Sequence, residues 1–164
     1  MDDRRRRFEA QALPHLDAAY NLARWLAPID AEDIAQEAML RAFRAFDGFR
    51  GGDAKPWLLA IVRNCCRNAR AQARRRSHVP LPEDDAGTMV SDDADPEVEA
   101  VRASESRRLN AAIALLPNEF REVLILREME EMSYREIAET TGAPIGTVMS
   151  RLARARGMLK EKLP

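Results

Sequence analysis

The chain has 164 residues, of which 32% are charged and 5% aromatic, and its formal net charge is −1. This composition favours helices over sheets, because strong strand formers are few. No apolar run approaches the roughly 20 residues of a membrane span. The N-terminal sequence MDDRRRRF lacks the apolar core of a secretory signal. We therefore predict an all-α protein that acts in the cytoplasm without membrane insertion.

The small net charge conceals a strong segregation of charge along the chain. Residues 1–76 contain 15 Lys/Arg and 10 Asp/Glu, a net charge of +5. Residues 77–101 contain no Lys/Arg and 8 Asp/Glu, a net charge of −8, and residues 102–164 contain 11 and 9, a net charge of +2. Two basic blocks separated by an acidic segment say more about binding partners than the total charge does.

Helical periodicity predicts a first helix over about residues 4–27, interrupted near Pro14, and a second over about residues 30–46. The inner face of the second helix is apolar: Ile34, Ala35, Ala38, Ala42 and Phe46. The opposite face carries Asp33, Gln36, Glu37, Leu40 and Arg44. A single exposed leucine needs no explanation. Ringed by polar side chains, Leu40 also fits the apolar centre of a docking surface, and the pattern leaves both interpretations open.

A glycine-rich loop and a third helix over about residues 56–76 follow. In the loop, Phe49 has no obvious helical partner. The inner face of the helix is apolar: Leu58, Ile61, Val62, Cys65, Cys66 and Ala69. Its outer face carries Arg63, Asn64, Arg67, Arg70 and Arg74. Any one of these arginines fits a solvated surface, but together they form an arginine ladder that suits binding to a phosphate backbone. An unpaired aromatic ring beside amide side chains suits binding of an unstacked base.

The cysteines and histidines predict no metal site, redox centre or cofactor. Cys65 and Cys66 are adjacent on a helix, where they cannot bridge to each other without strain. Two buried thiols in a reducing compartment are the simpler interpretation. His15 and His78 have no Cys, His or carboxylate cluster around them at ligand spacing.

Residues 77–96 are rich in Pro, Gly and acid, which predicts a flexible acidic linker between domains at residues 1–76 and 97–164. Composition alone fits an inert tether as well as a functional segment. Two amphipathic helices are expected after it, over about residues 96–116 and 118–130. The first should turn its apolar side inward: Val98, Val101, Leu109, Ile113 and Leu116.

Residues 133–162 predict a helix-turn-helix. Ser133 and Glu136 have capping-box spacing, Gly142 can take the left-handed conformation that ends a helix, and Pro144 suits the start of the next one. On the second helix one stripe is apolar: Ile145, Val148, Leu152, Ala155 and Leu159. The opposite stripe carries Thr147, Ser150, Arg151 and Arg154. This two-faced helix favours DNA recognition over a solvated hairpin.

Two motif blocks resemble the extracytoplasmic-function (ECF) sigma factors, the small bacterial transcription initiation factors. DIAQEAMLRAFRAF at 33–46 and WLLAIVRN at 57–64 resemble the promoter-melting domain of that family. LPNEFREVLIL at 116–126, SYREIA at 133–138 and GTVMSRL at 146–152 resemble its C-terminal, upstream-element-binding domain. The blocks have the family's order and are separated by an acidic linker.

The resemblance implies core RNA polymerase, promoter DNA and an anti-sigma factor as partners, and it assigns roles to three groups of residues. The stripe of Asp33, Gln36, Glu37, Leu40 and Arg44 corresponds to the surface that docks on the polymerase clamp helices. The −10 element would be bound by Phe49, Asn64 and Asn68, with Arg63 and Arg67 adding charge. The −35 element would face Thr147, Ser150, Arg151 and Arg154.

Departures from the family pattern limit what the resemblance implies. Met149 stands where many relatives carry arginine, and Ala153 where some carry an aromatic residue, so the resemblance leaves the −35 sequence open. No further domain follows Pro164, so we expect signal sensing to reside in another protein.

Three rival functions remain to be weighed. A sigma mimic that only occupies an anti-sigma factor would be expected to carry a phosphate-receiver domain, for which 164 residues leave no room. A helix-turn-helix repressor would leave the 33–44 stripe and the arginine ladder without a role. An enzyme is disfavoured, because the sequence offers no phosphate loop, no metal-ligand spacing and no nucleophile paired with a base.

Overall fold

The computed structural model describes residues 2–76 and 96–164, and the regular elements of these residues are all helical. The all-α prediction is confirmed. The predicted acidic linker lies outside the described residues except for Pro96, which begins a helix instead.

The N-terminal unit consists of α1 (Asp2–Ala12), α2 (Leu16–Leu26), α3 (Ala31–Ala45) and α4 (Ala54–Arg76), with short 3-10 turns η1 (Leu13–His15), η2 (Pro28–Asp30) and η3 (Phe46–Gly48) between them. The predicted interruption near Pro14 is confirmed, because η1 separates α1 from α2. Helices α2, α3 and α4 pack against one another around fully buried Leu22, Leu58 and Val62. Ala38 and Ala42 are also fully buried, and their small side chains let α3 approach its neighbours closely.

The C-terminal unit consists of α5 (Pro96–Ala114), α6 (Asn118–Glu128), α7 (Tyr134–Thr141) and α8 (Ile145–Lys162). The predicted capping box is present: the Glu136 amide donates to Ser133 Oγ at 3.1 Å, and the Ser133 amide donates to Glu136 Oε1 at 2.9 Å. Gly142 ends α7 with a φ of +72°, a left-handed conformation that suits glycine. Val148, Leu152 and Ala155 hold α8 against α6 and α7.

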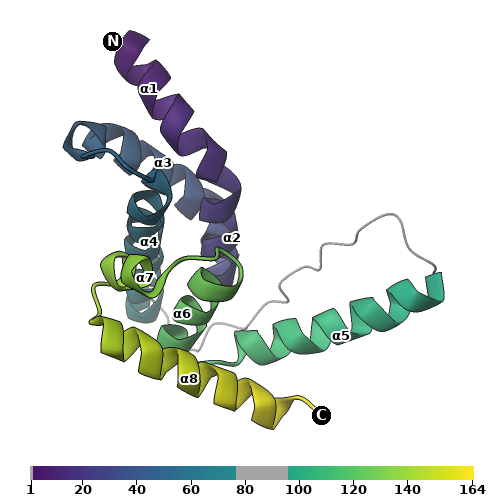
Figure 1. The fold of residues 1–164 in the computed structure, drawn as a ribbon. Coiled ribbons are helices and arrows are strands. Elements are labelled where there is room, and N and C mark those ends of the chain that lie inside the picture. The colour runs from purple at the N-terminus through teal and green to yellow at the C-terminus, as the bar shows by residue number, and fades with distance from the viewer. Residues whose placement is uncertain (1, 77–95) are drawn as a thin grey trace.

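Helix α5 differs from the prediction. Its N-terminal part extends away from the body of the protein (Figure 1), so Val98, Val101 and Leu109 are exposed rather than inward-facing. Ile113 on its last turn and Leu116 just after it are buried. The predicted inner position of Ile145 on α8 is also wrong, since its side chain is 43% exposed at the start of that helix.

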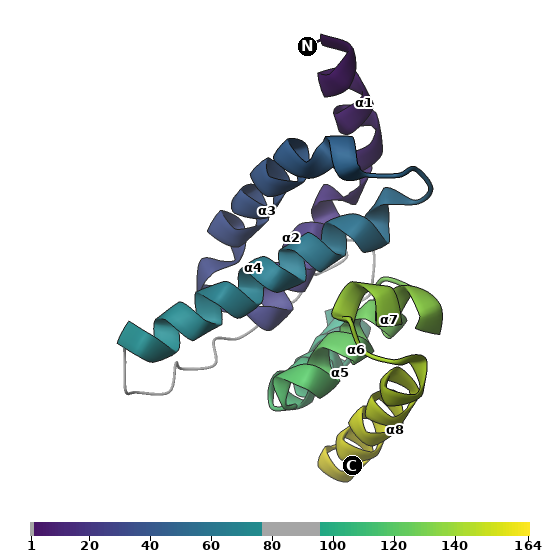
Figure 2. The ribbon, with the colours of Figure 1, turned by 90° about the vertical axis from the view of Figure 1, so that its left-hand side faces the viewer.

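The two units share an interface. Helix α6 packs on α2, and α7 packs on α4 (Figures 1 and 2). The buried residues of both units form one apolar cluster. Polar contacts cross the interface as well. Lys55 Nζ lies 3.0 Å from Glu130 Oε2, Arg121 Nη1 donates to the Trp25 carbonyl at 3.2 Å, and Thr140 Oγ1 donates to the Pro56 carbonyl at 3.3 Å. The C-terminal unit therefore covers one side of α4.

Candidate nucleic-acid interface and docking groove

The stripe predicted on the second helix lies on the outer face of α3. All five of its residues are exposed: Asp33, Gln36, Glu37, Leu40 and Arg44. Leu40 is 58% exposed, and Glu37 Oε1 lies 2.7 Å from Arg41 Nη2 one turn away. The stripe is thus a charged surface with one large apolar side chain at its centre.

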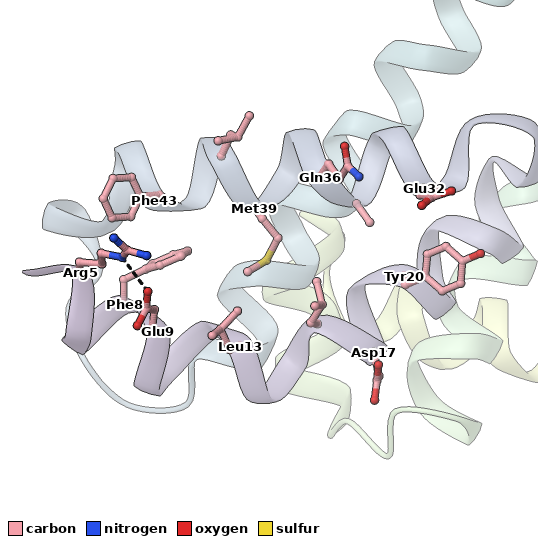
Figure 3. A pocket seen from close by; sticks show the side chains of 13 residues that line it. Arg5, Phe8, Glu9, Leu13, Asp17, Tyr20, Glu32, Gln36, Met39 and Phe43 are labelled. Atoms are coloured by element: carbon pink, nitrogen blue, oxygen red, sulfur yellow. Dashed lines mark hydrogen bonds and ion pairs between the residues drawn. The ribbon is translucent and has the colours of Figure 1, made fainter.

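Leu40 is not isolated, because it lines a groove of about 990 Å³ between α3 and the α1–α2 segment (Figure 3). Met39 and Leu40 form one wall, and Leu13, Leu16 and Tyr20 form the other. Each of these three facing residues is at least 41% exposed. Arg5, Glu9, Asp17 and Glu32 add charge at the rim, with Arg5 Nε 2.8 Å from Glu9 Oε1. The groove can hold an amphipathic segment with a polar outer face.

The sequence analysis missed the α1–α2 wall of this groove. Leu13, Leu16 and Tyr20 recur at spacings of three and four residues, which is a helical pattern. The pattern places them on one face, but whether another helix covers that face depends on how α1 and α2 meet at η1. A search for apolar residues at helical spacing on either side of Pro14 would have flagged them.

The side chain of Phe49 has aromatic neighbours, contrary to the prediction that it stands alone. Its ring stacks on Phe46 with centroids 6.0 Å apart and lies 5.0 Å from Trp57. The loop can fold back on α4 because Gly51 and Gly52 adopt φ values of +88° and +83°, which favour glycine. Phe49 is half-buried at the edge of this cluster, so part of its surface faces solvent.

The polar face of α4 is divided between solvent and the C-terminal unit. Asn64, Arg67 and Asn68 are exposed as predicted. Arg63 is not, because its Nε lies 2.8 Å from Oε2 of Glu122 on α6, and the two side chains are 12% and 3% exposed. Arg70 also turns partly inward: burial lowers the pKa of its guanidinium, and the Glu122 charge opposes that shift. The predicted outward orientation of Arg63 is thus wrong, because Glu122 of α6 holds its guanidinium, and Arg70 is half-buried rather than fully exposed.

Only two of the four residues in the polar stripe on α8 are fully exposed, whereas the helical periodicity places all four on the outer side. Ser150 and Arg154 are exposed. Thr147 is half-buried, and its carbonyl accepts a hydrogen bond from Ser150 Oγ at 3.1 Å. Arg151 is 26% exposed and lies 3.8 Å from Glu119 of α6. Met149 is 52% exposed, so it adds an apolar group to the solvent-facing side of the helix.

Both cysteines lie on the inner face of α4. Cys65 and Cys66 are buried free thiols, and burial raises the pKa of Cys66 to about 12, which disfavours the reactive thiolate. Among residues 2–76 and 96–164, no group of three or more His, Cys, Asp or Glu is placed to hold a metal ion. No described helix has the length and apolar character needed to cross a membrane.

Two regions of the chain match known sequence families. Residues 13–76 match Sigma-70 region 2, and residues 106–159 match Sigma-70, region 4. The ECF RNA polymerase sigma-E factor of Haemophilus influenzae is 36% identical over 149 residues, which cover 87% of this chain and 79% of that protein. The RNA polymerase sigma-H factor of Pseudomonas aeruginosa is 36% identical over 141 residues, which cover 82% and 73%.

Several solved structures have a similar fold, and two of them are described here. One is the sigma factor RpoE in complex with the anti-sigma factor NepR from Bartonella quintana, with a TM-score of 0.70 and 26% identity over 94% of this chain and 95% of that one. The other is CnrH in complex with the cytosolic domain of CnrY, with a TM-score of 0.65 and 25% identity over 96% and 87%. Because these alignments span both units, the similarity includes the placement of one unit against the other.

Proposed function

Because the chain belongs to the ECF family of RNA polymerase sigma factors, we propose that it binds core polymerase, recognises −10 and −35 promoter elements and directs transcription initiation. It acts in the cytoplasm on DNA and protein and performs no catalytic step itself. The observation that carries this proposal is the combination, in one chain, of an exposed docking stripe on α3 and a helix-turn-helix at α7–α8.

Core polymerase binds the stripe on α3 and the groove beside it. An interface core is apolar and its rim polar, which describes Leu40 and Met39 surrounded by Asp33, Gln36 and Glu37. A helix from the polymerase clamp would lay its apolar side against Leu40 and its charged side against the stripe.

The −10 element binds the exposed half of the α4 face. Asn64 and Asn68 carry amide groups that can donate to and accept from a base edge, and Arg67 provides charge for the adjacent backbone. The partly exposed ring of Phe49 offers an apolar wall for an unstacked base. Arg63 contributes only if its contact with Glu122 opens.

The −35 element binds α8 in the major groove. Ser150 and Arg154 are exposed and can reach base edges, while Thr147 and Arg151 on the flank are better placed for the backbone. Met149 brings an apolar contact to a position that suits a thymine methyl group.

An anti-sigma factor holds the chain inactive until a signal releases it. The support is that RpoE and CnrH, in two of the similar solved structures, are each in complex with a partner, which in the first case is called an anti-sigma factor. In this chain, the exposed groove between α3 and the α1–α2 segment is a surface on which such a partner could compete with polymerase.

Run-off transcription with purified core polymerase tests this function. Promoter-specific RNA supports a sigma factor, whereas DNA binding without a transcript supports a repressor built on the helix-turn-helix. In the same assay, Leu40→Asp should abolish association with core polymerase while helicity is retained, because Leu40 is 58% exposed. Ile29→Asp is the matched control, since Ile29 is 51% exposed in the same unit but lies outside the groove. Equal loss of helicity and binding in Leu40→Asp would make Leu40 a core residue.

A further inference from the structure

We propose that Arg4 on α1 is a positioning residue for the −10 element, because it fixes the start of the loop that carries Phe49. The inference rests on the proposed function. It adds a residue that the match to Sigma-70 region 2 does not include, since that match begins at residue 13. Arg4 acts through the loop and does not contact DNA itself.

The Arg4 guanidinium makes three contacts where α3 ends. Its Nη2 donates to the Phe43 carbonyl at 2.6 Å, and its Nε donates to Oδ1 of Asp47 at 3.0 Å. Its Cζ also lies 4.5 Å from the centroid of the Phe43 ring. A planar guanidinium can serve two acceptors and a ring face at once, whereas a lysine ammonium is a compact point charge. Arg4 therefore joins α1 both to the last turn of α3 and to η3.

The contact with the Phe43 carbonyl carries more weight than the ion pair. This carbonyl lies in the last turn of α3, where it accepts from the Phe46 amide. Carbonyls at a helix C-terminus lack regular helical partners and face the negative end of the helix dipole, so a cationic donor suits them. Asp47 is 77% exposed, and solvent weakens its attraction to Arg4. Arg4 thus mainly fixes the turn from α3 into η3.

An aromatic cluster extends this anchor to Phe49. Phe8 follows Arg4 by one turn of α1 and meets Phe43 and Phe46 edge-on, with centroids 5.2 and 5.5 Å apart (Phe8 and Phe43 are drawn in Figure 3). Phe46 in turn stacks on Phe49 at 6.0 Å. Ring pairs at these separations attract one another and prefer particular angles. The turn from α3 into η3 therefore determines where the Phe49 ring lies.

The loop depends on this anchor because its other side is permissive. Gly51 and Gly52 adopt left-handed conformations that glycine reaches freely, so they restrain the loop little. The Phe49 amide, by contrast, donates to the Phe46 carbonyl at 3.0 Å and ties Phe49 to η3. A displacement of η3 is thus passed directly to Phe49, the proposed wall for an unstacked base.

Without Arg4, the loop should sample conformations that cannot hold a base. The apparent dissociation constant is the intrinsic value divided by the fraction of molecules in the competent conformation. If that fraction falls from near one to about 0.1–0.3, binding of the −10 strand weakens about 3- to 10-fold. Binding to the −35 element and to polymerase should not change, because Arg4 lies neither on α8 nor in the stripe on α3.

The test compares Arg4→Ala with Arg6→Ala in the full chain bound to core polymerase. Both variants remove one arginine from α1, but Arg6 pairs with Asp2 at 2.8 Å on an exposed surface of the same helix. The probe is a labelled single strand with the −10 sequence of a promoter that the native chain transcribes. We expect Arg4→Ala to bind it about 3- to 10-fold more weakly than the native chain, and Arg6→Ala to bind it within about twofold.

Asp47→Ala distinguishes positioning from direct contact with DNA. If Arg4 touched DNA, removing a nearby carboxylate would lower repulsion and tighten binding. If Arg4 acts through the loop, Asp47→Ala should weaken binding in the native background but not in Arg4→Ala, where the contact is already lost. Tighter or unchanged binding by Asp47→Ala in the native background would overturn the proposal. Arg4→Lys should bind more like Arg4→Ala than like the native chain, since it keeps the charge but loses the fork.

Trp57 reports on the loop when no DNA is present. Its ring lies 5.0 Å from that of Phe49, and Trp25→Phe removes the second tryptophan of the chain. In this background, Arg4→Ala should make the emission of Trp57 easier to quench with acrylamide, while far-UV circular dichroism stays native. Arg6→Ala should alter neither signal.

Two further outcomes would overturn the proposal. Equal binding of the −10 strand by Arg4→Ala and Arg6→Ala would show that the loop does not depend on Arg4. Loss of helicity or of polymerase binding in Arg4→Ala would show that Arg4 stabilises the N-terminal unit as a whole rather than the loop. Failure of the proposed function looks different, because the native chain would then transcribe no promoter and bind no −10 strand.

Discussion

Helices α4 and α8 share the same pattern of residue types but differ in how much of the polar face is covered by the rest of the chain. Each packs an apolar face inward and turns arginines and small polar side chains outward. On α8 the exposed Arg154 faces solvent, whereas on α4 Arg63 is 12% exposed beneath the C-terminal unit. The comparison teaches that periodicity assigns a residue to a face of a helix, while a distant part of the chain decides whether that face is accessible.

The ion pairs on the two helices differ in the same way. On α4, Arg63 and Glu122 are 2.8 Å apart and nearly buried, so each charge depends on the other. On α8, Arg151 and Glu119 are 3.8 Å apart and 26% and 56% exposed, so solvent screens their attraction. A change in the first pair should alter the arrangement of the units, and a change in the second should alter only a local surface.

The largest effect on the accessible part of α4 is expected from Asn64→Ala. A factor that starts melting must hold an unstacked base, and unstacking costs a few kcal/mol, so the variant should form open complexes about 10- to 100-fold more slowly. Permanganate footprinting of melted thymines measures this rate directly. Binding to polymerase and to the isolated −35 element should stay near the native level, because Asn64 is exposed on the other unit.

A template that is already melted at the −10 element is the control for Asn64→Ala. It should restore much of the rate, since the cost of unstacking is then already met. Duplex opening at the native rate in Asn64→Ala would place the base pocket elsewhere on the molecule, and α4 would lose its assigned role.

Arg154→Ala tests the open face of α8. If Arg154 contacts a base through two hydrogen bonds, its loss should weaken promoter binding by about 1–3 kcal/mol, and more for the cognate duplex than for a random one. Lys160→Ala, at another exposed position of α8, should weaken binding to both duplexes equally, as loss of a phosphate contact does. Equal losses on both duplexes in Arg154→Ala would reduce Arg154 to a phosphate contact, and titration of the two labelled duplexes distinguishes the cases.

The features predicted correctly from the sequence depend on local interactions. The capping box joins Ser133 to Glu136, three residues away, and Gly142 ends its helix through its own backbone conformation. The outer position of Leu40 likewise follows from the periodicity of one helix. Each of these features is set within a few turns of chain, where spacing and residue type are sufficient to predict it.

The features that the sequence did not predict depend on contacts between distant segments. Glu122 reaches Arg63 across 59 residues, and the groove beside Leu40 needs Leu13 and Tyr20 from another helix. The exposure of Val98 follows from the absence of a covering helix at that end of α5, as far as the described residues extend. Apolar spacing predicts that such residues share a face, but only packing determines what that face meets.

Alkaline pH should distinguish the inner faces of the two helices, because α4 buries titratable thiols and the buried residues of α8 are Val148, Leu152 and Ala155. Burial raises the pKa of Cys66 from its ordinary value near 9 to about 12. Below pH 9 the thiol is protonated in both the folded and unfolded chain, and its contribution to stability is complete. Above pH 9 the unfolded chain loses the proton first, so the free energy of unfolding falls until about pH 12.

At pH 10 this loss should amount to about 1.4 kcal/mol relative to pH 8. Urea titrations of the native chain and Cys66→Ala at both pH values measure it, and the difference between the two pH values should be smaller in the variant. Comparing how the free energy of unfolding changes with pH in the two proteins removes the constant destabilisation caused by the smaller alanine side chain. Identical slopes would mean that Cys66 ionises normally in the folded chain and is less buried than its 1% exposure indicates.

The smallest effect is expected from Glu119→Gln, which removes a carboxylate from α6, the helix that also carries Glu122. The Glu119 carboxylate lies 3.8 Å from Arg151 and is 56% exposed, and an exposed pair of this kind is worth about 0–1 kcal/mol. Its loss should leave the chain compact and tighten binding to an isolated −35 duplex by less than about fivefold, because Arg151 is then freer to contact phosphates. The gain should shrink further as salt is raised, since both the pair and the phosphate contact are screened. If Glu119→Gln instead expanded the chain, exposure would not be what separates the two ion pairs, and the contrast between α4 and α8 would need another cause.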